Sequence, residues 1–119
     1  MTDLDQVEKF IFDKPGTVRE QPFGPEVLVY KLSGKIFALI AWEKSPLTIS
    51  LKCAPDNALF LRLKYAEVKP GYHLNKKHWN TVTLNGIIPG NVIKEMINES
   101  YDLILSTLSK KLRTSIKQA

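Results

Sequence analysis

The residues best suited to do chemistry lie in one short stretch of the chain, from Pro70 to Asn80. This stretch contains both histidines of the protein, one of its two tryptophans, two asparagines and two adjacent lysines. Ammonium groups contact phosphates, amide groups bond to phosphates or base edges, and aromatic rings stack on bases. The combination indicates a binding surface rather than a catalytic centre.

Neither metal binding nor catalysis is favoured by the spacing of these residues. His73 and His78 are five apart, not the four that align two ligands on a helix, and no carboxylate lies between them. Cys53 could join them in a Cys-His-Asn set, but its surroundings do not resemble a reactive-cysteine motif. The six glycines are scattered and fit no phosphate-binding pattern. We therefore expect no enzyme, no cofactor and no metal site.

Charge is distributed unevenly along the chain, whose formal net charge is +5. Residues 1–26 carry six acids and three bases, whereas residues 27–80 carry nine bases and three acids. Residues 81–119 carry five bases and three acids. The 70–80 stretch thus lies at the end of the basic part, which favours an anionic partner.

Length and composition indicate one domain covering residues 1–119, large enough to bury a core of its own. A single cysteine cannot form an internal disulfide, so we expect a cytoplasmic protein. The acidic start of the chain does not resemble a signal peptide, and the apolar run from Ile36 to Trp42 is too short to cross a membrane. We expect no membrane association and a monomer.

Helical periodicity marks three segments. Leu4, Val7, Phe10 and Ile11 predict a short N-terminal helix, with Thr2 and Asp5 as a variant capping box and acids along its other face. A second short helix is predicted to begin at Pro55 and to stop by Tyr65. A long apolar stripe predicts a final helix from Pro89 to about Ser109, followed by a basic tail.

Strands are predicted between these helices. Residues 27–32 and 35–42 form two strands around a Ser33-Gly34 turn, and residues 47–52 alternate between apolar and polar positions. Another strand covers residues 79–84, with Asn80, Val82 and Leu84 on one face. Phe23, in a proline-bracketed loop, is expected to close one end of the core. For Trp79, packing into the core and stacking on a ligand both stay open.

Several motifs together resemble the MmcQ/YjbR family. They are Phe23-Gly24-Pro25-Glu26-Val27, Ser50-Leu51-Lys52-Cys53, Pro70-Gly71-Tyr72-His73, His78-Trp79-Asn80-Thr81 and the closing Ser100-Tyr101-Asp102-Leu103 and Leu108-Ser109-Lys110-Lys111-Leu112-Arg113. The resemblance implies an α+β, CyaY-like two-layer α/β sandwich, with an antiparallel sheet packed against an N-terminal helix and a long C-terminal helix. It also implies DNA binding through a double-wing arrangement, for which the hairpins at Ser33-Gly34 and around residues 70–80 are the candidate wings.

The resulting hypothesis is a small, non-catalytic DNA-binding protein that uses a basic loop and the sheet surface. Its candidate nucleic-acid-binding residues are Lys52, Lys69, His73, Asn75, Lys76, Lys77, His78, Asn80 and Arg113. Two alternatives stay open. One is an adaptor that binds a protein or a small ligand in a groove at residues 72–80, and the other is divalent-metal binding by the acidic first helix.

Overall fold

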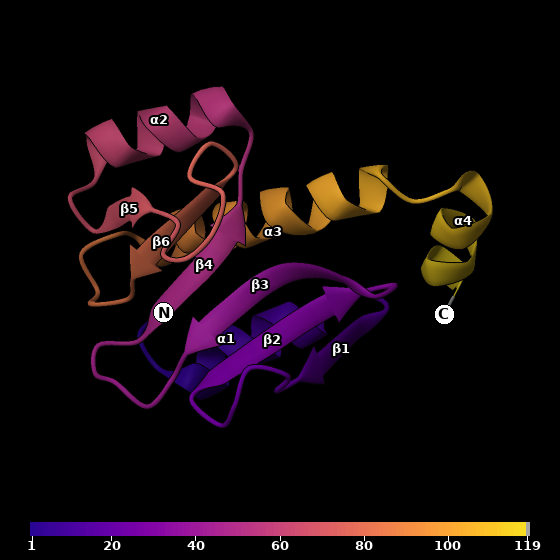
Figure 1. Cartoon of the computed structure of the whole chain (residues 1–119), viewed down its shortest axis with the longest axis horizontal. Coiled ribbons are helices and arrows are strands. Elements are labelled where there is room, and N and C mark those ends of the chain that lie inside the picture. The colour runs from indigo at the N-terminus through magenta and orange to yellow at the C-terminus, as the bar shows by residue number, and fades with distance from the viewer. Residues whose placement is uncertain (119) are drawn as a thin grey trace.

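The computed structural model describes residues 1–118, which form a six-stranded antiparallel sheet and four helices (Figure 1). The spatial order of the strands is β1-β2-β3-β4-β6-β5. In chain order the elements are α1 (Leu4–Phe12), β1 (Thr17–Glu20), β2 (Val27–Leu32), β3 (Lys35–Ala41), β4 (Thr48–Lys52), α2 (Pro55–Lys64), β5 (Val68–Pro70), β6 (Trp79–Thr83), α3 (Gly90–Ser106) and α4 (Lys110–Gln118).

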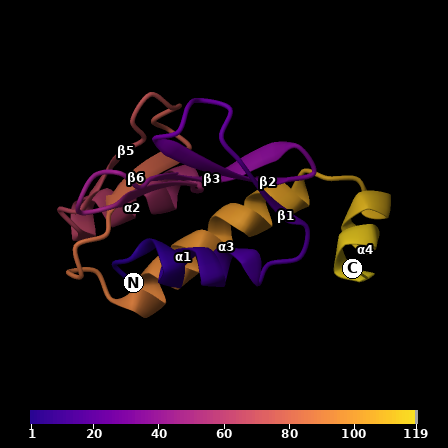
Figure 2. The same cartoon turned by 90° about the horizontal axis from the view of Figure 1, so that it is seen from below.

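The sheet and the helices form two layers. Helices α1 and α3 lie side by side against one face of the sheet, and no helix covers the opposite face of the described chain (Figure 2). Helix α2 contacts the edge strand β5 at one end of the sheet. The α+β, two-layer architecture expected from the sequence is confirmed.

Alternation along the strands decides which side chains enter the core. Leu47, Ile49 and Leu51 are buried on the helix-covered face, while the polar residues between them are half-buried on the other. The same alternation in β6 buries Asn80 and Val82 and leaves Trp79 half-buried. The predicted Ser33-Gly34 turn joins β2 to β3, and both of its residues have positive φ, the geometry of the tight turns that join adjacent strands.

Helix α3 supplies most of the opposing layer, because its apolar stripe faces the sheet. Ile93, Ile97 and Ile104 are almost completely buried, and the Tyr101 ring meets Phe37 of β3 edge-to-face with centroids 5.4 Å apart. The sequence prediction of the packing stripe is confirmed.

The beginning of the chain differs in two details from the sequence prediction. Asp3, not Thr2, caps α1, since its Oδ1 accepts a hydrogen bond from the amide of Gln6 at 2.9 Å. Strand β1 was not predicted, because it has four residues and carries Arg19 and Glu20. Charged residues are common on edge strands, so the apolar–polar alternation of such a strand is weak. Here Arg19 forms an ion pair with Glu8, and Glu20 forms one with Lys31.

The predicted final helix, expected to run to about Ser109, ends three residues earlier. Helix α3 ends at Ser106, where the hydroxyls of Ser106 and Thr107 donate to carbonyl oxygens three residues back. Ser109 then caps α4 by accepting from the amide of Leu112 at 3.2 Å. Ser and Thr compete locally with helical backbone bonds, so the predicted basic tail becomes a separate basic helix.

The prediction for Phe23 is wrong. Its ring is 63% exposed in the loop between β1 and β2 instead of closing the core. The carbonyl of Pro25 holds this loop, accepting from the side chains of Gln21 at 3.2 Å and Trp42 at 2.8 Å. Polar bonds to Pro25 thus fix the loop without burial of the Phe23 ring.

None of the helices within residues 1–118 has the length and apolar character needed to cross a lipid bilayer.

Candidate nucleic-acid interface

The sheet face opposite the helices carries most of the polar and basic side chains singled out in the sequence. Register places Ser50 opposite Thr81 and Lys52 opposite Trp79, while Lys69 of β5 lies opposite Thr81. Directly paired residues project to the same side of a sheet. The Ser50 and Thr81 hydroxyls are 2.8 Å apart, which confirms that they share this open face.

Two loops flank the open face. Residues 21–26 join β1 to β2, and residues 71–78 join β5 to β6, so the loops belong to the outermost strand pairs at opposite edges. Both rise on the side of the sheet away from α1 and α3 (Figure 2). A ligand lying on the open face would therefore meet a loop at each edge.

The 71–78 loop, hereafter the basic loop, has a fixed internal structure. The amide of His78 donates to the carbonyl of Asn75 at 3.2 Å, and the Asn75 side chain accepts from the amide of Lys77 at 2.9 Å. The amide of Cys53 donates to the carbonyl of His78 at 2.7 Å, which ties the loop to the end of β4. The two neighbouring lysines are consequently presented by an ordered backbone.

Gly71 allows the basic loop to close against β6. Its amide donates to the carbonyl of Trp79 at 2.8 Å, and a Cβ at this position would lie 2.7 Å from the Cβ of Trp79. Real Cβ atoms do not approach so closely, so only glycine fits here without shifting the strand.

Arg62 of α2 bonds to the C-terminal part of the basic loop and to the start of β6. Its Nε donates to Oδ1 of Asn80 at 2.7 Å, and its guanidinium also donates to the carbonyls of Trp79, at 3.2 Å, and Lys76. The sequence prediction did not include Arg62. A signal existed, because Arg62 follows the buried Ala58 by four residues and therefore shares its inward face of α2.

Four predicted lysines gather around the open face and the basic loop. Lys52 projects from β4 and Lys69 from β5, the two strands on either side of β6, and Lys76 and Lys77 are exposed on the loop. The ammonium of Lys76 donates to the carbonyl of Gly71 at 3.1 Å. Within residues 1–118 the ion pairs are Arg19–Glu8 and Lys31–Glu20, so none of the four lysines is neutralised by a carboxylate.

Aromatic rings accompany these charges. Tyr72 is 72% exposed, and its ring centroid lies 4.0 Å from that of the exposed His73. His73 has a φ of 58°, a left-handed conformation that is uncommon outside glycine. Trp79 is half-buried beside Lys52, which matches neither full burial in the core nor full exposure to a ligand.

Two predicted site residues do not belong to this surface. Asn80 is only 3% exposed, because strand alternation directs it toward α2, where its amide donates to the carbonyl of Ala58 at 3.3 Å. Arg113 lies on α4, beyond the far end of α3 and on the helix side of the sheet (Figure 2). The remaining predicted residues, which lie on the open face or the basic loop, are Lys52, Lys69, His73, Asn75, Lys76, Lys77 and His78.

Cys53 is buried and bonded to Glu99, an arrangement suited to packing rather than reaction. Glu99 accepts from the Cys53 thiol at 3.2 Å, the Ala54 amide at 3.2 Å and the Asn57 side chain at 2.7 Å. Its carboxylate thereby caps the N-terminus of α2, which carries no cap from its own side chains. Burial, with Glu99 nearby, raises the pKa of the Cys53 thiol from 9.0 to about 12.

We expect Cys53 to react slowly with thiol reagents in the folded protein. At pH 8 the raised pKa leaves roughly a thousandfold less thiolate than an unshifted thiol would have. Because the folded pKa lies above the unfolded one, the shift stabilises the fold fully below pH 9 and progressively less toward pH 12. Absorbance kinetics with a disulfide reagent, compared with the protein in denaturant, measure the difference. Equal rates in both conditions would contradict the burial of Cys53.

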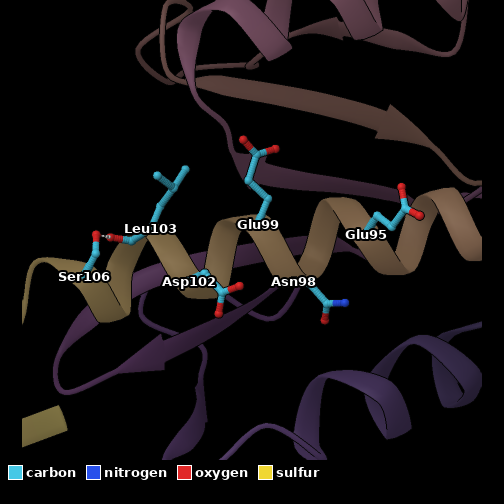
Figure 3. A pocket seen from close by; sticks show the side chains of 6 residues that line it. All are labelled: Glu95, Asn98, Glu99, Asp102, Leu103 and Ser106. Atoms are coloured by element: carbon cyan, nitrogen blue, oxygen red, sulfur yellow. Dashed lines mark hydrogen bonds between the residues drawn. The ribbon is translucent and has the colours of Figure 1, made fainter.

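A hollow along α3 is lined by Glu95, Asn98, Glu99, Asp102, Leu103 and Ser106 (Figure 3). Figure 3 shows Glu99 extending toward the sheet and α2, away from Asn98 and Asp102. Glu99 is bonded as described above, and Asn98 accepts a hydrogen bond from Lys14. These two lining side chains therefore bond within the chain itself.

Two of the acids on α1, Asp3 and Glu8, are engaged in internal contacts. Glu8 accepts from Arg19 at 2.7 Å and from the Tyr30 hydroxyl at 2.6 Å, and Asp3 caps the helix. In the part of the chain that the structure describes, no three His, Cys, Asp or Glu residues come together as metal ligands. The geometry gives no support to the metal-binding alternative.

Comparison of sequences places this chain beside proteins of one family. The YjbR family model matches residues 12–103, from the end of α1 to the last turn of α3. The protein YbdF of Escherichia coli O157:H7 is 40% identical over 90 residues, covering 76% of this chain and 74% of that protein. YjbR of Escherichia coli K12 is 28% identical over 115 residues, covering 97% and 98%.

Comparison of structures agrees. The crystal structure of the Deinococcus radiodurans protein DR2400, with a DUF419 domain, superposes with a TM-score of 0.93 at 33% identity. The alignment covers 98% of this chain and 89% of that protein. A crystal structure from Pseudomonas syringae gives a TM-score of 0.73 at 29% identity, covering 85% and 97%. The segment matched by the YjbR family model, residues 12–103, includes the open face, the basic loop and Arg62 but excludes Arg113.

Proposed function

This chain belongs to the MmcQ/YjbR family, and from its geometry we propose that it is a small, non-catalytic, cytoplasmic DNA-binding protein. The observation that carries the proposal is the set of four lysines, Lys52, Lys69, Lys76 and Lys77, around the open face without carboxylate partners in the described chain. Unneutralised ammonium groups on one surface attract a polyanion and displace its counterions.

The arrangement of the open face supports contact with a duplex rather than with an isolated anion. The sheet contributes Lys52 from β4 and Lys69 from the edge strand β5, and the basic loop between β5 and β6 adds two lysines. At the opposite edge, the 21–26 loop rises on the same side (Figure 2). Phosphate contacts of this kind position a protein on DNA, whereas the exposed Tyr72 and His73 rings are the groups available to bases.

Rigidity of the basic loop is part of the proposal. Arg62 and Gly71 hold Lys76 and Lys77 on a fixed backbone, so little loop entropy is lost when phosphates bind. His78 and Asn75 contribute through this backbone structure, since the His78 amide donates to the Asn75 carbonyl and the Asn75 side chain accepts from the Lys77 amide.

We expect duplex DNA binding to depend on salt and on the four lysines. Each phosphate contact adds about 0.9 to the steepness of the log–log plot of affinity against salt, so the fourfold Lys52→Ala, Lys69→Ala, Lys76→Ala, Lys77→Ala variant should reduce that steepness by about 3.6. Fluorescence anisotropy with a labelled duplex at several salt concentrations measures both affinity and slope.

A charge-matched control shows whether the loss of affinity depends on where the lysines lie or only on the net charge of the protein. The fourfold Lys9→Ala, Lys94→Ala, Lys110→Ala, Lys111→Ala variant removes the same charge from α1, α3 and α4, away from the open face. Its slope should stay close to that of the natural protein. If the natural protein did not bind DNA at low salt, the proposal would be wrong. If both variants lost the same affinity for DNA, the open face would not be the binding surface.

A further inference from the structure

Helix α2 exposes an apolar strip that nothing in the described chain covers. Ala58 and Leu61 face inward, but Leu59, Phe60 and Leu63 are 56%, 55% and 89% exposed. Other exposed apolar side chains, such as Val18, Ile87 and Leu112, belong to different elements. Single exposed apolar residues are ordinary on a protein surface, whereas a group on one helix face marks an interaction surface.

Charges at the two ends of the strip are arranged symmetrically. Asp56 lies in the first turn of α2 and Lys64 in the last, each four residues from Phe60. Both are exposed, and neither takes part in an ion pair within residues 1–118. The Lys64 ammonium lies 5.6 Å from the centre of the Phe60 ring, which places it at the border of the strip.

This arrangement is complementary to itself in one orientation only. If two copies pack antiparallel about a two-fold axis at Phe60, Asp56 of each copy meets Lys64 of the other, while the two Phe60 rings meet at the axis with the exposed leucines beside them. A parallel pair would instead bring Asp56 against Asp56 and Lys64 against Lys64. Antiparallel packing also opposes the helix dipoles favourably. An isologous contact of this kind is the usual basis of a dimer.

We propose that α2 is a homodimerisation surface and that its occupant is α2 of a second copy of this chain. The strip is short, since ten helical residues span only about 15 Å. An interface of this size is small for a protein dimer, so we expect the association to be weak and reversible. The proposal does not depend on DNA binding, because the strip uses none of the four lysines of the open face.

Sedimentation equilibrium without DNA, over a series of protein concentrations, tests the dimer. Asp56→Lys alone and Lys64→Asp alone each replace two attractive contacts by repulsive ones and should raise the dissociation constant roughly tenfold or more. The double variant Asp56→Lys with Lys64→Asp exchanges the charges and should recover the natural affinity. Rescue by exchange is expected from the antiparallel pair and not from unrelated damage to α2.

Leu63→Glu and Leu112→Glu give a second comparison between exposed leucines. Leu63→Glu should abolish the dimer, whereas Leu112→Glu, on α4, should leave it unchanged. Melting temperatures near that of the natural protein would show that both variants fold. A monomer at every concentration would overturn the proposal, as would a dimer that Leu63→Glu leaves intact or that charge exchange fails to restore.

Discussion

Replacing Arg62 with Met is expected to lower the free energy of unfolding by about 2–4 kcal/mol and to weaken DNA binding at least tenfold. Methionine keeps most of the apolar stem but removes donors to Asn80, Trp79 and Lys76. Oδ1 of Asn80 would then stay buried without its charged partner, which is the costly case for a polar group. Denaturant unfolding and anisotropy titration measure the two effects.

The weakened DNA binding follows from the position of Arg62 behind the basic loop. Without the guanidinium, the loop loses its bonds to α2, so Lys76 and Lys77 must be ordered when DNA binds. Amide hydrogen exchange should accelerate at Gly71 and His78, whose amides close the loop. Exchange rates that stay unchanged would contradict the scaffold role of Arg62.

Two further variants show whether Arg62 acts through its hydrogen bonds to the basic loop or through its positive charge. Lys9→Met removes one positive charge from an exposed position on α1, so both stability and DNA affinity should change little. Arg62→Lys retains the charge but cannot reproduce the planar set of donors, so it should still lose stability. If Arg62→Lys behaved like the natural protein, Arg62 would act through its charge alone.

Replacing Ser100 with Ala is expected to cost about 2–4 kcal/mol, although only one oxygen atom is removed. The Ser100 side chain is completely buried between α3 and the sheet. Its hydroxyl donates to the carbonyl of Phe37 and accepts from the amide of Lys52 at 2.9 Å. Alanine would leave both backbone groups without this partner inside the core.

Ser106→Ala on the same helix is the matched control. The Ser106 hydroxyl is exposed and donates to the carbonyl of Leu103 at 2.7 Å, so its loss should change stability by less than about 0.5 kcal/mol. Denaturant unfolding of both variants measures the difference. A cost for Ser100→Ala no greater than that for Ser106→Ala would show that Ser100 does not bridge the two layers.

The affinity for DNA distinguishes the role of Ser100 from that of Arg62. Ser100 supports the sheet but does not touch the basic loop, so Ser100→Ala should keep its affinity for DNA at temperatures where it is folded. Arg62→Met should lose affinity under the same conditions. Equal affinities of the two variants would contradict the proposed role of the loop.

Local sequence patterns predicted most of the fold and pointed to the family. Alternation at Leu47, Ile49 and Leu51 and the apolar stripe of α3 record which side chains leave water, and both predictions are confirmed. The resemblance to the MmcQ/YjbR family is confirmed by the family match. The short edge strand β1 and the break before α4 were missed because weak edge patterns and hydroxyl groups at helix ends leave little periodic signal.

The sequence by itself determined most of the helices and strands and the basic stretch, because these depend on periodicity and composition within short segments. Only the tertiary structure decided which members of that stretch share a surface. It placed Arg113 on the helix side and brought Arg62 against a loop that begins nine residues after it, whereas the burial of Asn80 follows from its alternation with Val82 and Leu84. The physical reason is that hydrogen bonds and ion pairs form between groups brought together by packing, and their partners leave no mark in the local pattern.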